Sequence, residues 1–294
     1  MPKRLTVGAP RRMVASALLA TGLLGLTLAT TAGREVAADF LGMFRVEKFT
    51  VVTYDPNYPV ERFTTLGRQL GTVTDTGGAD RLRIASSLSE ASLRVGFEVT
   101  QPGVLPAGAS NDPIFQTLAP RQVLFTLNQQ RAQQNLLANQ GIAPTIPPDL
   151  EGAGLQLNVP SAAVVTYLSD GTTPSDETLG PLLVVAQGPS PALEATGGAT
   201  LEEMRAFLLS TPDLPADAVQ QVSNIDDWTA TLPVPVPAGR VAWQETQVNG
   251  TPALLLADSE HVGSALVWKR GETIYTMIGQ LDQETLLATA ESMP

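Results

Sequence analysis

The chain contains no cysteine and only one histidine among its 294 residues. Without cysteine it can form no disulfide, thiolate nucleophile, iron–sulfur cluster or cysteine-rich zinc site. The single histidine, His261, cannot supply a multi-histidine metal site, and a Ser–His–Asp arrangement would have to use this one residue. The lack of cysteine leaves the compartment open, because a chain of this size needs no disulfides when it is exported.

Charged residues are also scarce, at 16% of the chain, whereas hydrophobic residues make up 43% and suffice for a core. The charge is unevenly placed, because five basic residues precede the first acidic residue, Glu35: Lys3, Arg4, Arg11, Arg12 and Arg34. The remainder keeps 13 basic residues (18 minus 5) against 29 acidic ones, a net charge of −16. A region with this net negative charge repels the phosphate groups of nucleic acids, so nucleic-acid binding is not expected.

The N-terminal region predicts a membrane segment. Residues 13–32 contain no charged side chain, and as a helix twenty residues span roughly the 30 Å hydrocarbon core. We therefore expect a short basic cytoplasmic segment (1–12), a transmembrane signal anchor (13–33) in contact with the lipid bilayer, and an extracytoplasmic remainder at the cell membrane. The alternative is a signal peptide cleaved near Ala32 or Ala37, which gives a secreted chain.

The rest of the chain predicts an α+β fold in two stretches, 34–150 and 151–294, which form either one sheet or two. Residue patterns favour strands at 49–54, 81–84, 97–100, 123–127, 155–159, 163–168 and 182–186. Helices are expected at 60–70, 87–96, 128–139, 200–210 and 215–222, with capping boxes at Ser87/Glu90 and Thr200/Glu203. Loops are expected at 72–80, 142–153 and 188–199, and an extended polyproline-like connector at 233–237.

The last sixty residues give the clearest pattern. Strands are expected at 240–248, 252–257, 265–269 and 273–278, followed by a helix at 283–292. Asn249-Gly250 is a strong two-residue hairpin signal, because both turn positions need positive φ. The prediction is an antiparallel hairpin meander covered by a helix.

Several segments resemble the extracytoplasmic domain of bacterial anti-sigma-factor-like membrane proteins, an uncharacterised group. They are residues 37–49, 200–210, 227–228, 248–250, 266–279 and 286–292. The resemblance implies a sensor-like or scaffold-like outer domain with a membrane or envelope protein partner. The cytoplasmic part departs from that group, since about twelve residues without histidine or cysteine cannot form a zinc-containing sigma-binding domain. The resemblance implies no catalytic residue.

Few residues are candidates for chemistry. His261 could act as a general base with Ser259 or Ser264, but the chain has no Gly-x-Ser-x-Gly elbow, so a solvated turn histidine is the favoured interpretation. The acidic pairs Glu202-Glu203 and Asp226-Asp227 could serve acid–base chemistry or bind a cation. Placement at helix starts and turns favours a structural role for both pairs.

The remaining motifs are weaker. Gly77-Gly78 and Gly197-Gly198 lack a P-loop lysine, so they give no support for nucleotide binding. Trp228, Trp243 and Trp268 could line a ligand groove, but core positions are favoured because tryptophan buries a large apolar area.

These observations predict no catalytic residue, cofactor or metal site, and hence a protein that is not an enzyme. The leading hypothesis is a membrane-anchored, extracytoplasmic domain that senses or binds a protein or an envelope component. The alternatives are a carrier of lipid or of small apolar ligands, and a hydrolase of unrecognised type.

Overall fold

The computed structural model describes residues 46–55, 61–76, 82–140, 146–171, 181–211, 214–258 and 263–294. The predicted cytoplasmic segment 1–12, the predicted transmembrane segment 13–33 and His261 lie outside these ranges. Among the helices of the described ranges, none is both long enough and apolar enough to cross a membrane.

The helices and strands alternate irregularly along the chain. The helices are α2 (Glu61–Leu70), α3 (Leu88–Val95), α4 (Gln129–Gln140), η1 (Pro148–Leu150), α5 (Leu201–Leu209), α6 (Ala216–Ser223) and α7 (Gln283–Glu291). The first nine strands are β1 (Lys48–Tyr54), β2 (Gly71–Asp75), β3 (Arg83–Ala85), β4 (Ile114–Leu118), β5 (Arg121–Leu127), β6 (Gly154–Val159), β7 (Ala162–Tyr167), β8 (Leu183–Pro189) and β9 (Ala192–Thr196). The last five are β10 (Thr231–Pro237), β11 (Val241–Val248), β12 (Thr251–Asp258), β13 (Ser264–Arg270) and β14 (Thr273–Gly279).

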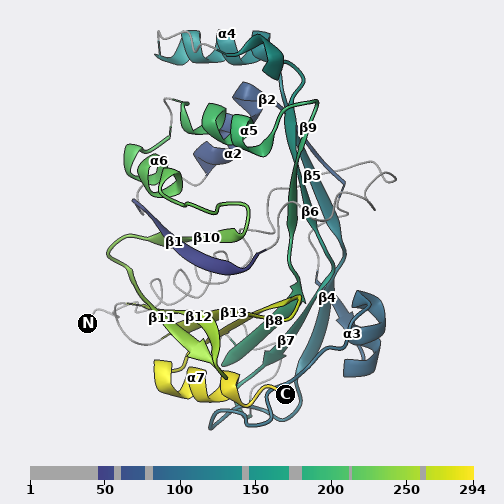
Figure 1. The fold of residues 1–294 in the computed structure, drawn as a ribbon. Coiled ribbons are helices and arrows are strands. Elements are labelled where there is room, and N and C mark those ends of the chain that lie inside the picture. The colour runs from purple at the N-terminus through teal and green to yellow at the C-terminus, as the bar shows by residue number, and fades with distance from the viewer. Residues whose placement is uncertain are drawn as a thin grey trace, which may run out of the picture.

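The strands form three sheets. An eight-stranded antiparallel sheet has the order β11-β12-β13-β14-β8-β7-β4-β3, and a four-stranded antiparallel sheet has the order β2-β5-β6-β9. The third sheet is the parallel pair β1-β10, which lies between the other two in Figure 1. Helices packed on antiparallel sheets confirm the predicted α+β class. The predicted C-terminal meander is confirmed as β11 to β14, with α7 packed against it.

The hairpin between β11 and β12 has the predicted turn. Asn249 and Gly250 have φ angles of 49° and 79°, and Val248 pairs with Thr251 across the turn. The Asn249 side chain donates from Nδ2 to the carbonyl oxygen of Glu291 over 2.8 Å. This hydrogen bond ties the hairpin to the end of α7, so the local turn also fixes the covering helix.

Three pairs of consecutive strands run from one large sheet into the other, and the chain bends at the same level in all three. The chain passes from β4 to β5 through Pro120, from β6 to β7 through Pro160, and from β8 to β9 through Pro191. The register aligns the bends, because Leu118 pairs with Ala162 and Arg121 pairs with Val159. Proline has no N–H, so the ladder is interrupted at each bend and the sheet turns there. Figure 1 shows these strands continuing from the lower sheet into the upper one.

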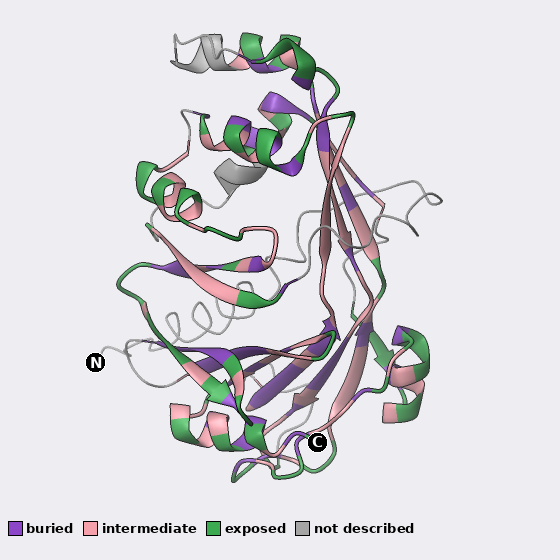
Figure 2. Ribbon diagram, viewed as in Figure 1, coloured by how far each residue is buried: buried purple, intermediate pink, exposed green. Residues whose placement is uncertain are grey.

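The eight-stranded sheet has two different faces. On one face, α3, α7 and the segment 97–109 cover a core that includes Trp268, Tyr167 and Leu286. Trp268 is fully buried and stacks on Tyr275, with the ring centroids 5.2 Å apart. Figure 2 shows the buried residues of this sheet concentrated in its central strands. The opposite face is the one turned toward β1 and β10.

A second core lies beside the four-stranded sheet, where α2, α4 and α5 pack. Leu70, Leu127 and Met204 are its largest fully buried side chains. At the far end of this sheet, Arg121 and Asp75 form a buried ion pair at 2.9 Å. α5 packs in this second core, and Arg205 of α5 bonds to the end of α6. α6 in turn contacts β1, so these two helices connect β1 and β10 to the four-stranded sheet.

We call the parallel pair β1-β10 the strap. Its side chains pack on the eight-stranded sheet, with Val234 and Val236 buried against Leu254 and Leu256. Gln221 of α6 holds the strap from the other side: its Oε1 accepts from Thr53 N (2.8 Å) and Oγ1 (3.0 Å), and its Nε2 donates to Thr53 O (3.0 Å). The side-chain amide therefore pairs with the backbone of β1 as a neighbouring strand would.

Several sequence-based predictions of local structure are wrong. The expected loop 72–80 contains β2, where Gly71 lets the backbone approach Thr126 so closely that a Cβ would lie 2.0 Å from its carbonyl oxygen. The expected strand 97–100 belongs to no sheet, and the backbone of its Thr100 bonds to the Gln187 side chain instead. β4 and β9 were not predicted, and the expected connector 233–237 is the paired strand β10. Each depends on a partner distant in sequence.

The two predicted capping boxes have different outcomes. The Thr200/Glu203 box is confirmed, with both reciprocal hydrogen bonds present. At α3 the Ser87 hydroxyl accepts from Glu90 N as predicted, but the Glu90 carboxylate reaches Ser86 instead of Ser87. Glu90 also pairs with Arg94 four residues on.

We predict that Glu90 stabilises the fold in a pH-dependent way. Hydrogen bonds from the Ser86 hydroxyl and N–H, together with Arg94, lower the pKa of Glu90 from 4.5 to about 2. A lowered folded-state pKa contributes stability above the unfolded pKa of 4.5, and this contribution is lost as the pH falls toward 2. Glu90→Gln should therefore lower the melting temperature at pH 7 and have little effect near pH 2. Thermal melts across this range test it, with the exposed Glu98→Gln as the control that should not change.

We also predict that Gln221 limits the opening of the strap. Gln221→Leu removes the partners of Thr53 N–H and C=O, which costs about 1–3 kcal/mol of local stability. The amides of β1 should then exchange hydrogen roughly ten to a hundred times faster, as followed by mass spectrometry of peptides covering 48–54. Gln220→Leu, the same change at the exposed neighbouring position, should leave this exchange unchanged. Equal protection of β1 in both variants would contradict the assigned role.

Candidate functional site

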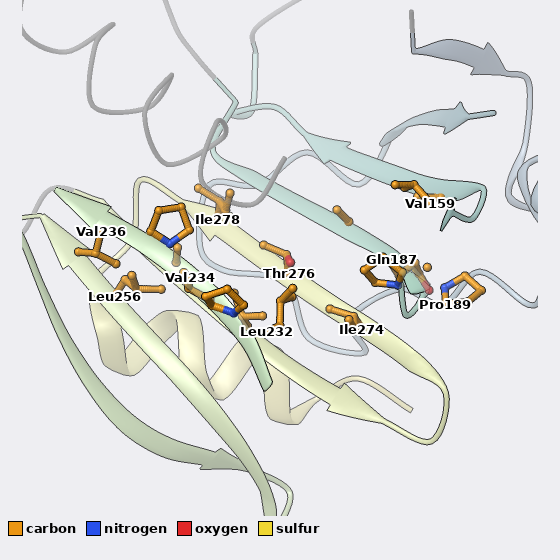
Figure 3. A pocket seen from close by; sticks show the side chains of 18 of the residues that line it. Val159, Gln187, Pro189, Leu232, Val234, Val236, Leu256, Ile274, Thr276 and Ile278 are labelled. Carbon is orange, nitrogen blue, oxygen red and sulfur yellow. The ribbon is translucent and has the colours of Figure 1, made fainter. Parts of the chain in front are cut away.

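An apolar groove lies between the strap and the eight-stranded sheet, and Figure 3 shows it from close by. Its enclosed volume is about 140 Å³, and it is partly open to solvent. The lining comes from β10 above, from four strands below and from the strand bends at one end. The lining residues are Val159, Pro160, Ala162, Ala186, Gln187, Gly188, Pro189, Pro191, Leu232, Pro233, Val234, Pro235, Val236, Pro237, Val241, Leu256, Ala265, Val267, Ile274, Thr276 and Ile278.

The floor of the groove is one face of the eight-stranded sheet. Residues that pair directly across antiparallel strands project to the same face. Ala186 pairs with Thr276, and Thr276 pairs with Val267, which gives one continuous row across β8, β14 and β13. The strict alternation of these strands sends the bulky residues of the core to the other face. Small and aliphatic side chains are therefore left to line the floor.

The roof of the groove is β10. Its valines at 234 and 236 point down and pack with Leu256 and Ala265, which closes one side of the groove. All residues of β10 from Leu232 to Pro237 line the groove, whereas no residue of β1 does. The groove therefore runs along the edge of β10 that faces away from β1.

The end wall is the bend between the two large sheets. Val159, Pro160, Pro189 and Pro191 come from two of the three aligned bends and contribute only apolar side chains. Gly188 lies at the same point, where an added Cβ would stand 3.1 Å from the Cβ of Ala162. The strands approach closely here because glycine has no side chain. The same close approach therefore forms both the bend and the end wall of the groove.

Among the described residues that line the groove, two carry a polar side chain, Gln187 and Thr276. Gln187 is buried and its amide is already used: Oε1 accepts from Thr100 N at 2.9 Å, and Nε2 donates to Thr100 O at 2.8 Å. This leaves the Thr276 hydroxyl on the floor as the polar side-chain group available to a ligand. Contacts in the groove are therefore almost wholly apolar.

None of the described residues that line the groove is ionisable. In the strap, burial raises the pKa of Tyr54 at the end of β1, and the Arg240 guanidinium partly offsets this rise. No group of three or more histidine, cysteine, aspartate or glutamate residues suited to a metal ion occurs within the described ranges. The arrangement can bind and enclose apolar matter.

None of the described candidate residues that the sequence suggested lines the groove. His261 and Ser259 lie outside the described ranges, as does Gly77-Gly78. Ser264 is buried, and its hydroxyl donates to the carbonyl oxygen of Leu281 over 2.8 Å, so it holds the chain after β14 in place. Gly197 and Gly198 form the left-handed turn before α5.

The pair Glu202-Glu203 lies in a structural cluster at the start of α5, whereas the exposed pair Asp226-Asp227 lies in the turn before β10, where Asp227 Oδ1 accepts from the Thr229 hydroxyl at 3.0 Å. Hydrogen bonds from Thr200 lower the pKa of Glu203, in keeping with its capping role. Glu202 accepts from Trp228 Nε1 over 2.9 Å, and the Arg205 guanidinium stacks 5.4 Å above the Trp228 ring. Arg205 also donates to Val222 O at the end of α6. The cluster therefore ties α5 to α6 and to the chain that enters β10, outside the groove.

The three tryptophans have three different environments. Trp268 is in the core, as predicted, whereas Trp228 is half-buried in the cluster near α5. Trp243 is 48% exposed on the edge strand β11, directly paired with Leu256 and hence on the groove side of the sheet. None of the three lines the enclosed part of the groove. The signal that could have found the site was the proline–valine alternation of 233–237, which places apolar side chains on one face of a strand.

The comparisons with known proteins are limited to one stretch of the chain. Residues 223–293 match the model of a domain of unknown function, DUF4367, which here covers β10 and the whole C-terminal meander. No curated protein and no solved structure matches the chain. None of these findings bears on the resemblance to anti-sigma-factor-like proteins, which stays a prediction. The chain is thus similar over about a quarter of its length to a domain family without an assigned function.

Proposed function

We propose that this protein is a non-catalytic binding domain of the cell envelope, and that it holds the apolar part of an envelope ligand in the groove under the strap. The observation that carries the proposal is the groove itself, with an almost wholly apolar lining between β10 and the eight-stranded sheet. Of the hypotheses drawn from the sequence, the lipid or small-apolar-ligand carrier fits this geometry best. This proposal also retains one part of the leading hypothesis, namely that the protein binds an envelope component.

Burial of hydrocarbon supplies the binding energy in such a site. Each CH₂ group removed from water contributes about 0.8 kcal/mol, without any need for directional contacts. The enclosed volume of about 140 Å³ is close to that of apolar cavities that take up benzene. The enclosed part therefore receives one small apolar group or a stretch of a chain. A longer ligand would extend through the open side.

A second candidate function, docking of a protein partner on the edge of the sheet, is supported by Trp243. Tryptophan is enriched at binding hot spots, and this one is half exposed on the edge strand β11. The position beside Leu256 places it next to the groove. The same experiment can detect both contacts.

We predict that a photoreactive side chain in the groove captures an acyl-containing molecule. Benzoylphenylalanine would be introduced at Ile274, which lines the groove, in the full-length chain in its native membranes, and adducts would be identified by mass spectrometry. The same group at the exposed Gln133 on α4 serves as the control. Ala186→Phe, which fills the floor, should lower the yield at Ile274 at least fivefold, whereas Gln133→Phe should not.

Two outcomes would overturn the proposal. One is an adduct yield at Ile274 no higher than at Gln133. The other is crosslinking of Ile274 to residues 1–45 of the same chain, which would show that the chain fills its own groove. A protein captured from a photoreactive group at Trp243, with no adduct at Ile274, would favour the second candidate.

A further inference from the structure

The edge of β10 along the groove has an unusual composition. The parallel pairing fixes which residues face β1: Lys48 N donates to Ala230 O at 3.2 Å, and Ala238 N donates to Tyr54 O at 2.9 Å. Backbone groups alternate sides along a strand. The even-numbered residues of β10 therefore bond to β1, and the odd-numbered ones face the groove.

Each odd-numbered groove residue of β10 is a proline: Pro233, Pro235 and Pro237. Proline has no N–H, and its ring places a CH₂ group where the donor would be. The even positions keep their N–H groups for β1, which is why a strand with three prolines can pair at all. The result is an edge that presents carbonyl acceptors and ring methylenes, but no backbone donor.

The floor adds no backbone donor either. β8, β14 and β13 are interior strands whose backbone groups are used in ladders on both sides. The Gln187 amide is used by Thr100, and Thr276 contributes one hydroxyl. A ligand in the groove thus meets apolar side chains and carbonyl oxygens along its length.

This arrangement discriminates between two classes of envelope ligand. An extended peptide that adds to a strand edge needs donors for its carbonyl groups as well as acceptors for its N–H groups. Each peptide carbonyl left unpaired in the groove lowers the affinity roughly tenfold. A hydrocarbon chain has no polar group of its own to leave unpaired, and it gains free energy from the burial of its CH₂ groups.

The other edge of the strap makes the contrast clear. On β1, Thr53 faces away from β10, and its N–H and C=O are both paired with the Gln221 amide. At Thr53 the strap thus has both its backbone donor and its backbone acceptor satisfied. On the groove side, the three prolines have removed the donors instead.

We propose that the groove is selective for a hydrocarbon chain, such as the acyl chain of a lipid, and excludes extended peptides, and that Pro233, Pro235 and Pro237 set this selectivity. This inference rests on the proposed function, since it specifies what the groove holds. It identifies β10 as the determinant of ligand class.

Two photoreactive probes of similar length test the selectivity on the full-length chain in nanodiscs. One is dodecanoic acid with a terminal diazirine, and the other is a blocked five-residue peptide of alternating threonine and photo-leucine. Labelled sites would be mapped by mass spectrometry to the groove segments 183–189, 231–237 and 273–279. We expect at least tenfold more groove labelling by the fatty acid, and loss of that labelling in Ala186→Phe.

The double variant Pro233→Ala, Pro235→Ala returns two donors to the edge. It should keep fatty-acid labelling within about twofold and raise peptide labelling at least threefold. Peptide labelling of the native chain equal to that of the fatty acid would overturn the selectivity while leaving the groove function standing. Peptide labelling that stays at background in the double variant would overturn the role of the prolines. Absence of groove labelling by both probes would overturn the proposed function itself.

Discussion

The bend shared by three strand pairs is the constraint on which the rest of the structure depends. The connections β4–β5, β6–β7 and β8–β9 each join the eight-stranded sheet to the four-stranded one, with a proline at each bend. Because the register aligns the bends, all of these strands change direction at one line, and the two sheets meet at an angle there. Without the bend, α5, α6 and the strap would have no position above the floor, and the groove would have no end wall.

The roof of the groove is connected to the upper half through side chains. Arg205 joins α5 to the end of α6 and stacks on Trp228, near the start of β10, and Gln221 joins α6 to β1. Toward the floor, the strap makes apolar contacts through residues such as Val234, which packs with Leu254. Apolar packing tolerates small displacements better than a hydrogen-bonded ladder, because it is not directional. The strap is therefore fixed by hydrogen bonds on the side of α6 and by non-directional apolar contacts on the side of the eight-stranded sheet. This combination suits a site that admits an apolar chain.

The prolines of the chain have two roles that share one physical basis. At the bends, Pro120 and Pro160 interrupt ladders so that strands change direction. On β10, Pro235 and its neighbours sit at the positions that face away from β1, so the ladder survives and only the free edge loses its donors. In both cases the missing N–H is the cause, and the position in the register decides the effect.

The sequence by itself determined the elements whose signals are local. The Asn249-Gly250 hairpin, the Thr200/Glu203 capping box and the C-terminal meander follow from turn chemistry and alternation within a few residues. β2, β4 and β9 were missed, because each is stabilised by pairing with strands distant in sequence. The groove has the same origin: β10 pairs with β1 about 180 residues away, and its prolines look like a connector until that pairing orients them. Local chemistry thus determined the composition of the groove walls, and only the tertiary structure decided that those walls face one another, because burial of an apolar face depends on which segment covers it.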